Sequence, residues 1–278
     1  MNILITGSNG FIGSHLTKSL LEDYKLHYIF SKKQKSTINK GFIIDLADKE
    51  LTTRKISKLF TDIKINGIIH LASKMASSSD IENTKILEDN MVIAMNISKI
   101  AKIIMPDFFI NFSSMSIYPN VSGTFSEKSL PNPYKNSDFI YGLSKNNLEK
   151  IINYFLNKAN IKISHLRIAQ VYGKGMNSNR TIPMMLKELK ENNEITIYGN
   201  GDRSSNFIQI DKLISVVNFI VKKKISGIYN IGEENISYYE LANKLINQCG
   251  NKNSVIKILN KGSNEKFVLD TNKFDSLS

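Results

Sequence analysis

The sequence is poor in cysteine and proline, lacks tryptophan, and has no long apolar run. Its single cysteine, Cys249, rules out an internal disulfide, which fits a reducing cytoplasm. A membrane span needs about 18 consecutive apolar residues, and the nearest run, around residues 100–110, is broken by Lys102, Pro106 and Asp107. The chain starts directly on a strand pattern, so we expect no secretory signal. We therefore expect a cytoplasmic protein without a membrane partner.

Acidic residues are fewer than basic ones, 25 against 37, and the formal net charge is +12 at pH 7. A large positive charge attracts polyanions. However, the lysines are spread along the whole chain without a basic stripe interleaved with aromatic residues, so we expect no nucleic-acid partner. The histidines have no spacing typical of metal ligands, and we expect no metal. The charge favours instead a ligand that carries phosphate groups.

The clearest motif lies in the first thirteen residues, where a short apolar run leads into three glycines spaced three apart. Gly7 permits a tight turn after the strand, and Gly10 has no Cβ, so a pyrophosphate can approach the backbone. Gly13 allows the following helix, which begins with Phe11 and Ile12, to pack close to the strand. The pyrophosphate would then lie at a helix N-terminus. A glycine turn without a ligand is the alternative, but this context predicts a dinucleotide site.

Strand and helix patterns alternate through the first two thirds of the chain, which predicts an α/β fold with a doubly wound parallel sheet of the Rossmann type. After about residue 170 the pattern loosens. We therefore expect a dinucleotide-binding domain over 1–170, which also receives about 206–225, and a smaller C-terminal α/β substrate lobe over 171–278. The expected strands are 3–6, 26–30, 42–44, 67–71, 108–112 and 161–168, and the expected helices are 11–21, 49–60, 82–104 and 139–157.

The end of the second predicted strand bears on the choice of cofactor. NAD sites usually place a carboxylate there for the ribose hydroxyls, whereas this strand continues into Ser31, Lys32 and Lys33. A serine and two lysines can bind a 2′-phosphate that a carboxylate would repel, so we predict a preference for NADP(H), with NAD(H) as the alternative. Exposed lysines without a ligand would give the same pattern. Asp45 and Leu46 are expected beside the adenine, although Asp45 can equally cap a helix.

Ser114, Tyr141 and Lys145 form the candidate catalytic set. Ser114 lies in a hydroxyl-rich loop after the fifth predicted strand, and Tyr141 and Lys145, four residues apart, share one face of a helix. The pKa of a phenol is about 10, and a nearby ammonium favours the phenolate, which makes Tyr141 usable as an acid–base group. Most tyrosine–lysine pairs at this spacing are simply helix surface. The order of these residues, after the glycine loop, is what distinguishes this pair.

Together these motifs resemble the extended short-chain dehydrogenase/reductase family, the NAD(P)-dependent sugar-nucleotide epimerases, dehydratases and reductases. The resemblance runs through nearly the whole chain. It implies that Leu71, Ala72, Ser73 and Asn90 lie beside the cofactor. It also implies a homodimer, because two long helices often form the subunit contact in this family. The matching segments are residues 6–13, 69–73, 113–118, 141–145, 166–175, 197–201, 206–211 and 229–241.

The chain departs from the family pattern in the substrate lobe. Gln170 stands where the family has an asparagine, and Ser205 stands where it has an arginine. Arg203, two residues earlier, is expected to supply the contact to the substrate diphosphate, because its planar guanidinium suits a diphosphate. We therefore expect Gln170 and Arg203, together with Ser114, to bind a nucleotide sugar.

The motif around Ser114 restricts the reaction. Dehydratases of the family carry an acid pair where this chain has Met115 and Ser116, so elimination of water is not expected. Our leading hypothesis is an NADPH-dependent reductase of a nucleotide-linked 4-keto-6-deoxy sugar, and the alternative is an NAD-dependent nucleotide-sugar 4-epimerase. In either enzyme Tyr141 is the acid–base group, Lys145 lowers its pKa and holds the nicotinamide ribose, and Ser114 orients the C4 oxygen. A cofactor sensor without catalysis would not need these residues.

Overall fold

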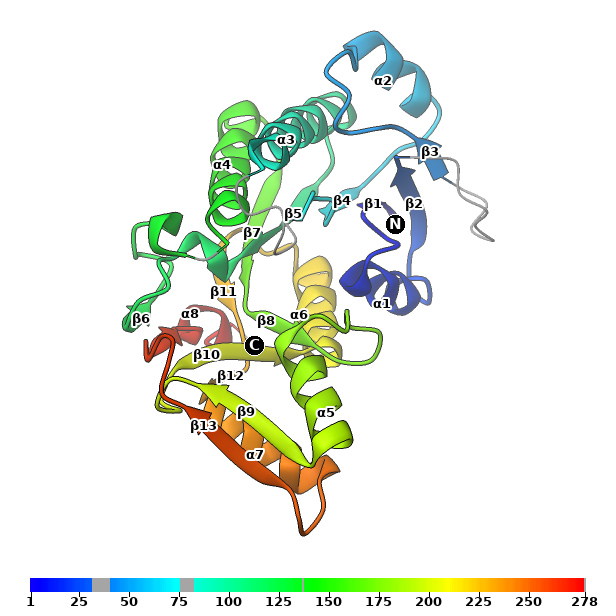
Figure 1. Ribbon diagram of the computed structural model, residues 1–278. Coiled ribbons are helices and arrows are strands. Elements are labelled where there is room, and N and C mark those ends of the chain that lie inside the picture. The colour runs from blue at the N-terminus through cyan, green and yellow to red at the C-terminus, as the bar shows by residue number, and fades with distance from the viewer. Residues whose placement is uncertain (32–40, 76–82, 137, 278) are drawn as a thin grey trace.

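A computed structural model describes residues 1–31, 41–75, 83–136 and 138–277 (Figure 1). Its centre is a seven-stranded parallel sheet in the order β11-β7-β5-β4-β1-β2-β3. The predicted α/β fold with a doubly wound, Rossmann-type sheet is therefore confirmed. The strands are β1 (Asn2–Thr6), β2 (Lys25–Phe30), β3 (Gly41–Ile43), β4 (Gly67–His70), β5 (Phe108–Ser114), β7 (Lys162–Ile168) and β11 (Gly227–Ile231).

Helices cover both faces of this sheet (Figure 1). The layers follow from the strand period of two, since Ile3 and Ile5 of β1 point into one apolar cluster and Leu4 points into the other. The first face is covered by α1 (Phe11–Leu20) and α6 (Ile210–Lys223), and the second by α2 (Thr53–Phe60), α3 (Thr84–Ile104) and α4 (Phe139–Leu156).

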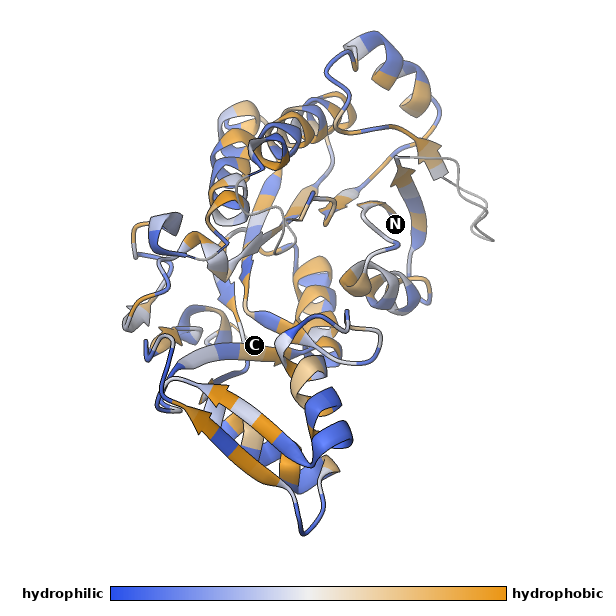
Figure 2. Cartoon of the chain, in the orientation of Figure 1, coloured by the Kyte–Doolittle hydropathy of each residue, from blue (hydrophilic) through white to orange (hydrophobic). Residues whose placement is uncertain are grey.

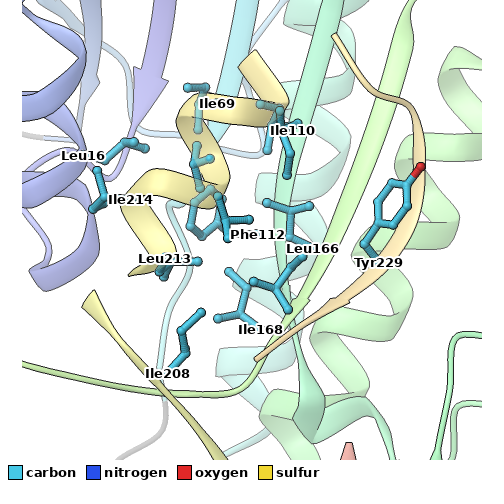
Figure 3. Close-up of a cluster of buried hydrophobic side chains, with 14 of the residues drawn as sticks. Leu16, Ile69, Ile110, Phe112, Leu166, Ile168, Ile208, Leu213, Ile214 and Tyr229 are labelled. Atoms are coloured by element: carbon cyan, nitrogen blue, oxygen red, sulfur yellow. The ribbon is translucent and has the colours of Figure 1, made fainter. Parts of the chain in front are cut away.

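The first apolar layer joins strands and helices that are far apart in the sequence. Figure 3 shows Leu16 of α1 and Leu213 of α6 beside the strand residues Ile69 and Phe112. All four are buried, and each such side chain contributes about 1.5–3 kcal/mol on leaving water. Helix α6, although it follows much later in the sequence than α1, is thereby held against the same face of the central sheet. Within the part of the chain described, no helix is long and apolar enough to span a membrane.

The structure adds an edge strand that the sequence analysis did not identify. Strand β11 pairs in parallel with β7, and its Tyr229 and Ile231 are buried. Strand β5 is longer than predicted, because it continues through Ser113 to Ser114, which pairs with Ile168. The second helix begins at Thr53 rather than at residue 49. The Thr52 side chain accepts the Lys55 N–H at 3.3 Å and caps the start of this helix.

The remaining elements form a smaller lobe at the carboxyl edge of the sheet (Figure 1). Figure 2 shows apolar stretches along β9 and β13, and a separate apolar cluster there includes Ile195, Ile197 and Leu241. The elements are β6 (Gly123–Phe125), β8 (Gln170–Tyr172), α5 (Thr181–Asn192), β9 (Glu194–Tyr198), β10 (Ser204–Gln209), β12 (Glu234–Ser237), α7 (Tyr238–Cys249), β13 (Val255–Leu259), β14 (Phe267–Leu269) and α8 (Asn272–Asp275). Their sheets have the orders β12-β10-β8, β13-β9 and β14-β6.

Candidate active site

The glycine loop joins β1 to α1 at the carboxyl edge of the sheet. Gly7 has a φ of +75°, which favours glycine, and a Cβ there would lie 2.8 Å from Ala72 N. A Cβ on Gly13 would overlap the Gly7 carbonyl and lie 2.8 Å from Ser8 Cα. A Cβ on Gly10 would meet only the Gly7 oxygen, at 3.4 Å, so this side of the loop is open. Open backbone at the start of α1 fits a dinucleotide pyrophosphate.

The end of β4 is fastened to the glycine loop. The Thr6 hydroxyl is hydrogen-bonded to His70 Nδ1 at 2.7 Å and accepts the Ala72 N–H at 3.2 Å, while Leu71 N donates to Thr6 O at 3.1 Å. Burial, reinforced by the charge of Lys145, lowers the pKa of His70 to about 3. The imidazole is therefore neutral, and it serves to hold Leu71 and Ala72 in place.

Asn90 of α3 forms hydrogen bonds with Ser73 and Lys74, the two residues that follow Ala72. Its Oδ1 accepts from Ser73 Oγ at 3.2 Å and from Lys74 N at 2.8 Å, and its Nδ2 donates to Lys74 O and to Ser144 Oγ. Asn90 therefore shapes the loop after β4 rather than only meeting a ligand. The predicted cofactor residues that lie around the glycine loop and this segment are Gly7, Gly10, Phe11, Ile12, Gly13, Leu71, Ala72, Ser73 and Asn90.

The predicted adenosine end is more exposed. Ser31 follows β2 directly and is exposed, while Lys32 and Lys33 lie outside the described residues. Asp45 Oδ1 accepts the backbone N–H two residues on, at 2.9 Å. Asp45 thus closes a local turn and does not cap a helix, because α2 begins further along the chain. Leu46 is buried in the second apolar layer.

Ser114 is the last residue of β5 and lies at the carboxyl edge of the sheet. It is half-buried, and its Oγ accepts the Ser116 N–H at 3.1 Å, which starts the short 3₁₀ turn Met115–Ile117. Within the described chain the Ser114 O–H has no acceptor. It is therefore available to a substrate oxygen.

Tyr141 and Lys145 lie on one face of α4, beside the end of β5. Lys145 Nζ is 5.5 Å from the centroid of the Tyr141 ring and donates to Phe112 O at 2.8 Å. The close approach of α4 to the segment after β5 depends on Gly142, because a Cβ there would overlap the Ser116 carbonyl oxygen. The structure therefore brings together the three predicted catalytic elements: the strand end, the tyrosine and the lysine.

Burial and neighbouring charges shift the pKa values of Tyr141 and Lys145. Burial raises the pKa of Tyr141 to about 12; the charge of Arg180 opposes this rise and that of Asp138 reinforces it. Burial lowers the pKa of Lys145 to about 8, and the charge of Glu149 opposes the fall. The phenol is therefore protonated at neutral pH, and the lysine is mostly charged. Arg180, at the start of α5, was not among the predicted site residues.

A buried ion pair lies behind these residues, and the sequence analysis missed it. Arg167 of β7 donates from Nη2 to Glu149 Oε2 at 2.9 Å and from Nε to Oε1 at 3.1 Å. Both side chains are almost completely buried. The spacing was a usable signal, since Glu149 follows Lys145 by four residues, just as Lys145 follows Tyr141.

Two of the predicted substrate residues, Gln170 and Arg203, both contact Tyr238. Gln170 Nε2 donates to Ser205 Oγ at 2.8 Å and lies 3.5 Å from Tyr238 Oη. The Arg203 guanidinium lies over the Tyr238 ring, 5.1 Å from its centroid. Gln170 thus reaches Ser205 across β8 and β10. Tyr238, which links the two expected contacts, was not predicted.

The described residues contain no cluster of three or more histidine, cysteine, aspartate or glutamate side chains that would hold a metal ion. What they do bring together is an anion-binding backbone, a phenol beside an ammonium, and a serine hydroxyl. This set can bind a dinucleotide and transfer a proton to or from an oxygen.

The chain is similar in sequence and in fold to several known proteins. The chain is 27% identical over 274 residues to the dTDP-D-glucose 4,6-dehydratase of Dictyostelium discoideum, covering 88% of this chain and 61%, about three fifths, of that protein. It is also 27% identical over 245 residues to Protein CapI of Staphylococcus aureus, covering 81% and 71%. The structure of the UDP-glucuronic acid 4-epimerase from Bacillus cereus, in complex with UDP-glucuronic acid and NAD, matches with a TM-score of 0.81 at 26% identity, over 100% of this chain and 92% of the other.

The sequence model of one family extends over most of the chain. The NAD dependent epimerase/dehydratase family matches residues 3–232, from β1 through the edge strand β11. The matched range includes the glycine loop, Ser114, Tyr141 and Lys145. This confirms the resemblance derived from the sequence motifs: the chain belongs to the NAD dependent epimerase/dehydratase family.

Proposed function

We propose that this chain catalyses oxidation and reduction at C4 of a nucleotide-linked sugar. The observation that carries the proposal is the placement of the Lys145 ammonium 5.5 Å from the Tyr141 ring, beside the strand end that presents Ser114. The glycine loop, residues 71–73 and the loop held by Asn90 would hold the dinucleotide. That cofactor supplies the hydride acceptor or donor when bound.

Tyr141 would move the proton of the C4 oxygen. Its pKa of about 12 keeps the phenol protonated before ligands bind, so it can donate to a carbonyl oxygen. Ser114 would hold the same oxygen through its unengaged O–H. Lys145 has three N–H groups, of which one donates to Phe112 O. The others are available to ribose hydroxyls, and the charge favours the phenolate when Tyr141 accepts a proton.

Epimerisation at C4 with retained NAD is the first candidate reaction. It is supported by the Bacillus cereus UDP-glucuronic acid 4-epimerase, which resembles this chain over its whole length and contains NAD. An epimerase must reach both protonation states of Tyr141, which would first take the proton of the C4 hydroxyl and then return it to the C4 oxygen. The proximity of Lys145 to the ring serves the first of these steps.

Reduction of a nucleotide 4-keto-6-deoxy sugar by NADPH is the second candidate. The observation that favours it is the exit of β2 into Ser31, Lys32 and Lys33, without a carboxylate for the ribose hydroxyls. A reductase would use Tyr141 only as a proton donor, which its raised pKa suits. Dehydration is not proposed, because Met115 and Ser116 follow Ser114 where an acid pair would be needed.

We propose that residues 1–170, with about 206–225, hold the dinucleotide and that 171–278 hold the substrate. Gln170 and Arg203 would contact its nucleotide diphosphate. Helices α3 and α4, which pack together on one face of the sheet, would form the contact of a homodimer. A cytoplasmic location is consistent with the single cysteine.

The proposal is tested by identifying the bound cofactor and the conversion together. The purified protein is denatured, and any released dinucleotide is identified by mass spectrometry. The protein is then incubated with UDP-glucuronic acid, UDP-glucose and UDP-N-acetylglucosamine without added cofactor, and separately with NADPH and a nucleotide 4-keto-6-deoxy sugar. Retained NAD with isomerisation supports the epimerase, and NADPH consumption supports the reductase. If neither reaction depends on Tyr141, the proposed chemistry is wrong.

A further inference from the structure

The ion pair between Glu149 and Arg167 is unusual for its burial: the two residues are 4% and 3% exposed. Removing two charges from water is costly, and an ion pair repays that cost only with good geometry and further hydrogen bonds. The ion pair is not part of the glycine loop, because β5 and β4 separate β7 from β1 in the sheet. It lies instead directly behind the proposed catalytic residues.

Glu149 and Lys145 form hydrogen bonds with two consecutive residues of β5. Tyr141, Lys145 and Glu149 occur at intervals of four and so share one face of α4. Lys145 Nζ donates to Phe112 O at 2.8 Å, and Glu149 Oε1 accepts from Ser113 Oγ at 2.5 Å. The next residue of the strand is the proposed catalytic serine. The two charged side chains therefore set the register of α4 against the end of β5.

The Glu149 carboxylate is also bound by Arg167 of β7. Arg167 pairs in register with Ser113 and binds both oxygens of Glu149. Its Nη1 also donates to Tyr118 Oη at 2.8 Å, and Tyr118 Oη donates to Asn230 Oδ1 of β11 at 2.9 Å. One carboxylate thus connects α4 to β5 and, through Arg167, to both strands beyond it.

Within the described residues, few titratable groups face Lys145. On α4 they are Tyr141 and Glu149, and on β4 there is His70, which burial keeps neutral because its pKa falls to about 3. On β7, Arg167 and His165 face Glu149 rather than Lys145. Burial lowers the pKa of Lys145 to about 8, and Glu149 is the charge that raises it again.

We propose that Glu149 is a positioning residue, which holds Tyr141 and Ser114 in register and keeps Lys145 charged through its own negative charge. The effect on turnover rests on the proposed function. The ionisation of Lys145 does not, because it is a property of the protein without ligands. The two parts can therefore be measured separately.

Glu149→Gln removes the negative charge of Glu149 at nearly constant side-chain shape, and so tests its effect on the ionisation of Lys145. The protein is labelled with ¹³C at lysine Cε, and the Lys145 signal, assigned by its loss in Lys145→Met, is followed against pH by NMR. We expect the Lys145 midpoint to fall by about one unit or more in Glu149→Gln. The alkaline limb of the turnover profile should move in the same direction. Ser113→Ala keeps the carboxylate and should leave the Lys145 midpoint at its wild-type value, even if the melting temperature drops.

Glu149→Gln leaves Arg167 buried without a counter-charge, which destabilises the folded protein. The double variant Glu149→Gln, Arg167→Met removes both charges and provides the same measurement in a core without an isolated ion. A folded variant of either kind in which Lys145 titrates at the wild-type pH overturns the inference. If the wild-type protein converts no nucleotide sugar, but the Lys145 midpoint falls as expected in Glu149→Gln, only the proposed function is contradicted.

Discussion

The proposed proton-transfer end and the proposed substrate end of the site are built in different ways. At the first, Lys145, Glu149 and Arg167 are buried and joined by hydrogen bonds to β5 and β7. At the second, Gln170 and Arg203 are half-buried and meet through one long hydrogen bond and one ring contact to Tyr238. A change in the first leaves a buried charge without a partner, whereas a change in the second meets solvent. The residues proposed for the chemistry therefore belong to the core of the fold, whereas those proposed for substrate binding lie at its more exposed edge.

The largest effect is expected from Tyr141→Phe. It removes the hydroxyl that moves the proton but leaves the ring on which Lys145 lies, so turnover should fall about 10²–10⁴-fold. Dinucleotide binding, measured by fluorescence titration, should persist. Turnover near the wild-type value would show that the proton is handled elsewhere.

The glycine loop offers a matched pair of variants with different outcomes. Gly13→Ala places a methyl group against the Gly7 carbonyl and Ser8, so we expect both a lower melting temperature and the loss of dinucleotide binding. Gly10→Ala meets only the Gly7 oxygen at 3.4 Å, so the melting temperature should hardly change while binding still weakens. Equal loss of stability in the two variants would contradict an open ligand side at Gly10.

Two buried histidines in the core make stability depend on pH. Burial lowers the pKa of His70 to about 3 and that of His165 to about 4, against about 6.5 in the unfolded chain. The unfolded state then binds more protons, so this contribution is fully present above pH 6.5 and is lost as the pH falls towards 4. At pH 5 the loss is on the order of 2 kcal/mol for each histidine.

Urea unfolding at pH 7 and pH 5 measures this loss. The double variant His70→Asn, His165→Asn removes both imidazoles and keeps the carboxylates that titrate in the same range. Its free energy of unfolding should change less between the two pH values than that of the wild type. The same change in both proteins would assign the acid sensitivity to other groups.

The smallest effect is expected at the substrate end. Arg203→Ala removes one guanidinium from a half-buried position, so the KM for a nucleotide sugar should rise about tenfold, with kcat nearly unchanged. Arg54→Ala, in α2, removes an exposed charge of the same type and serves as the control. If both variants raise KM equally, overall charge rather than a diphosphate contact is responsible.

Two of the four expected helices were predicted to within one residue at each end. The helices expected at 11–21 and 139–157 were found at 11–20 and 139–156, because apolar residues there recur at the helical period between clear end signals. The end of β5 was less predictable. Ser113 and Ser114 are polar and indicate a loop, but pairing with β7 continues the strand through them. Strand β11 was missed because a short apolar run does not reveal which sheet it joins.

The sequence by itself determined the glycine loop, the parallel sheet and the candidate catalytic set, because each depends on residue types at short spacings. It also determined that Tyr141 and Lys145 share a helix face. Only the tertiary structure decided what lies opposite that face. The Glu149–Arg167 pair and the Gln170–Ser205 contact each join residues from separate elements. Local periodicity carries no information about such partners, since they depend on how strands and helices pack.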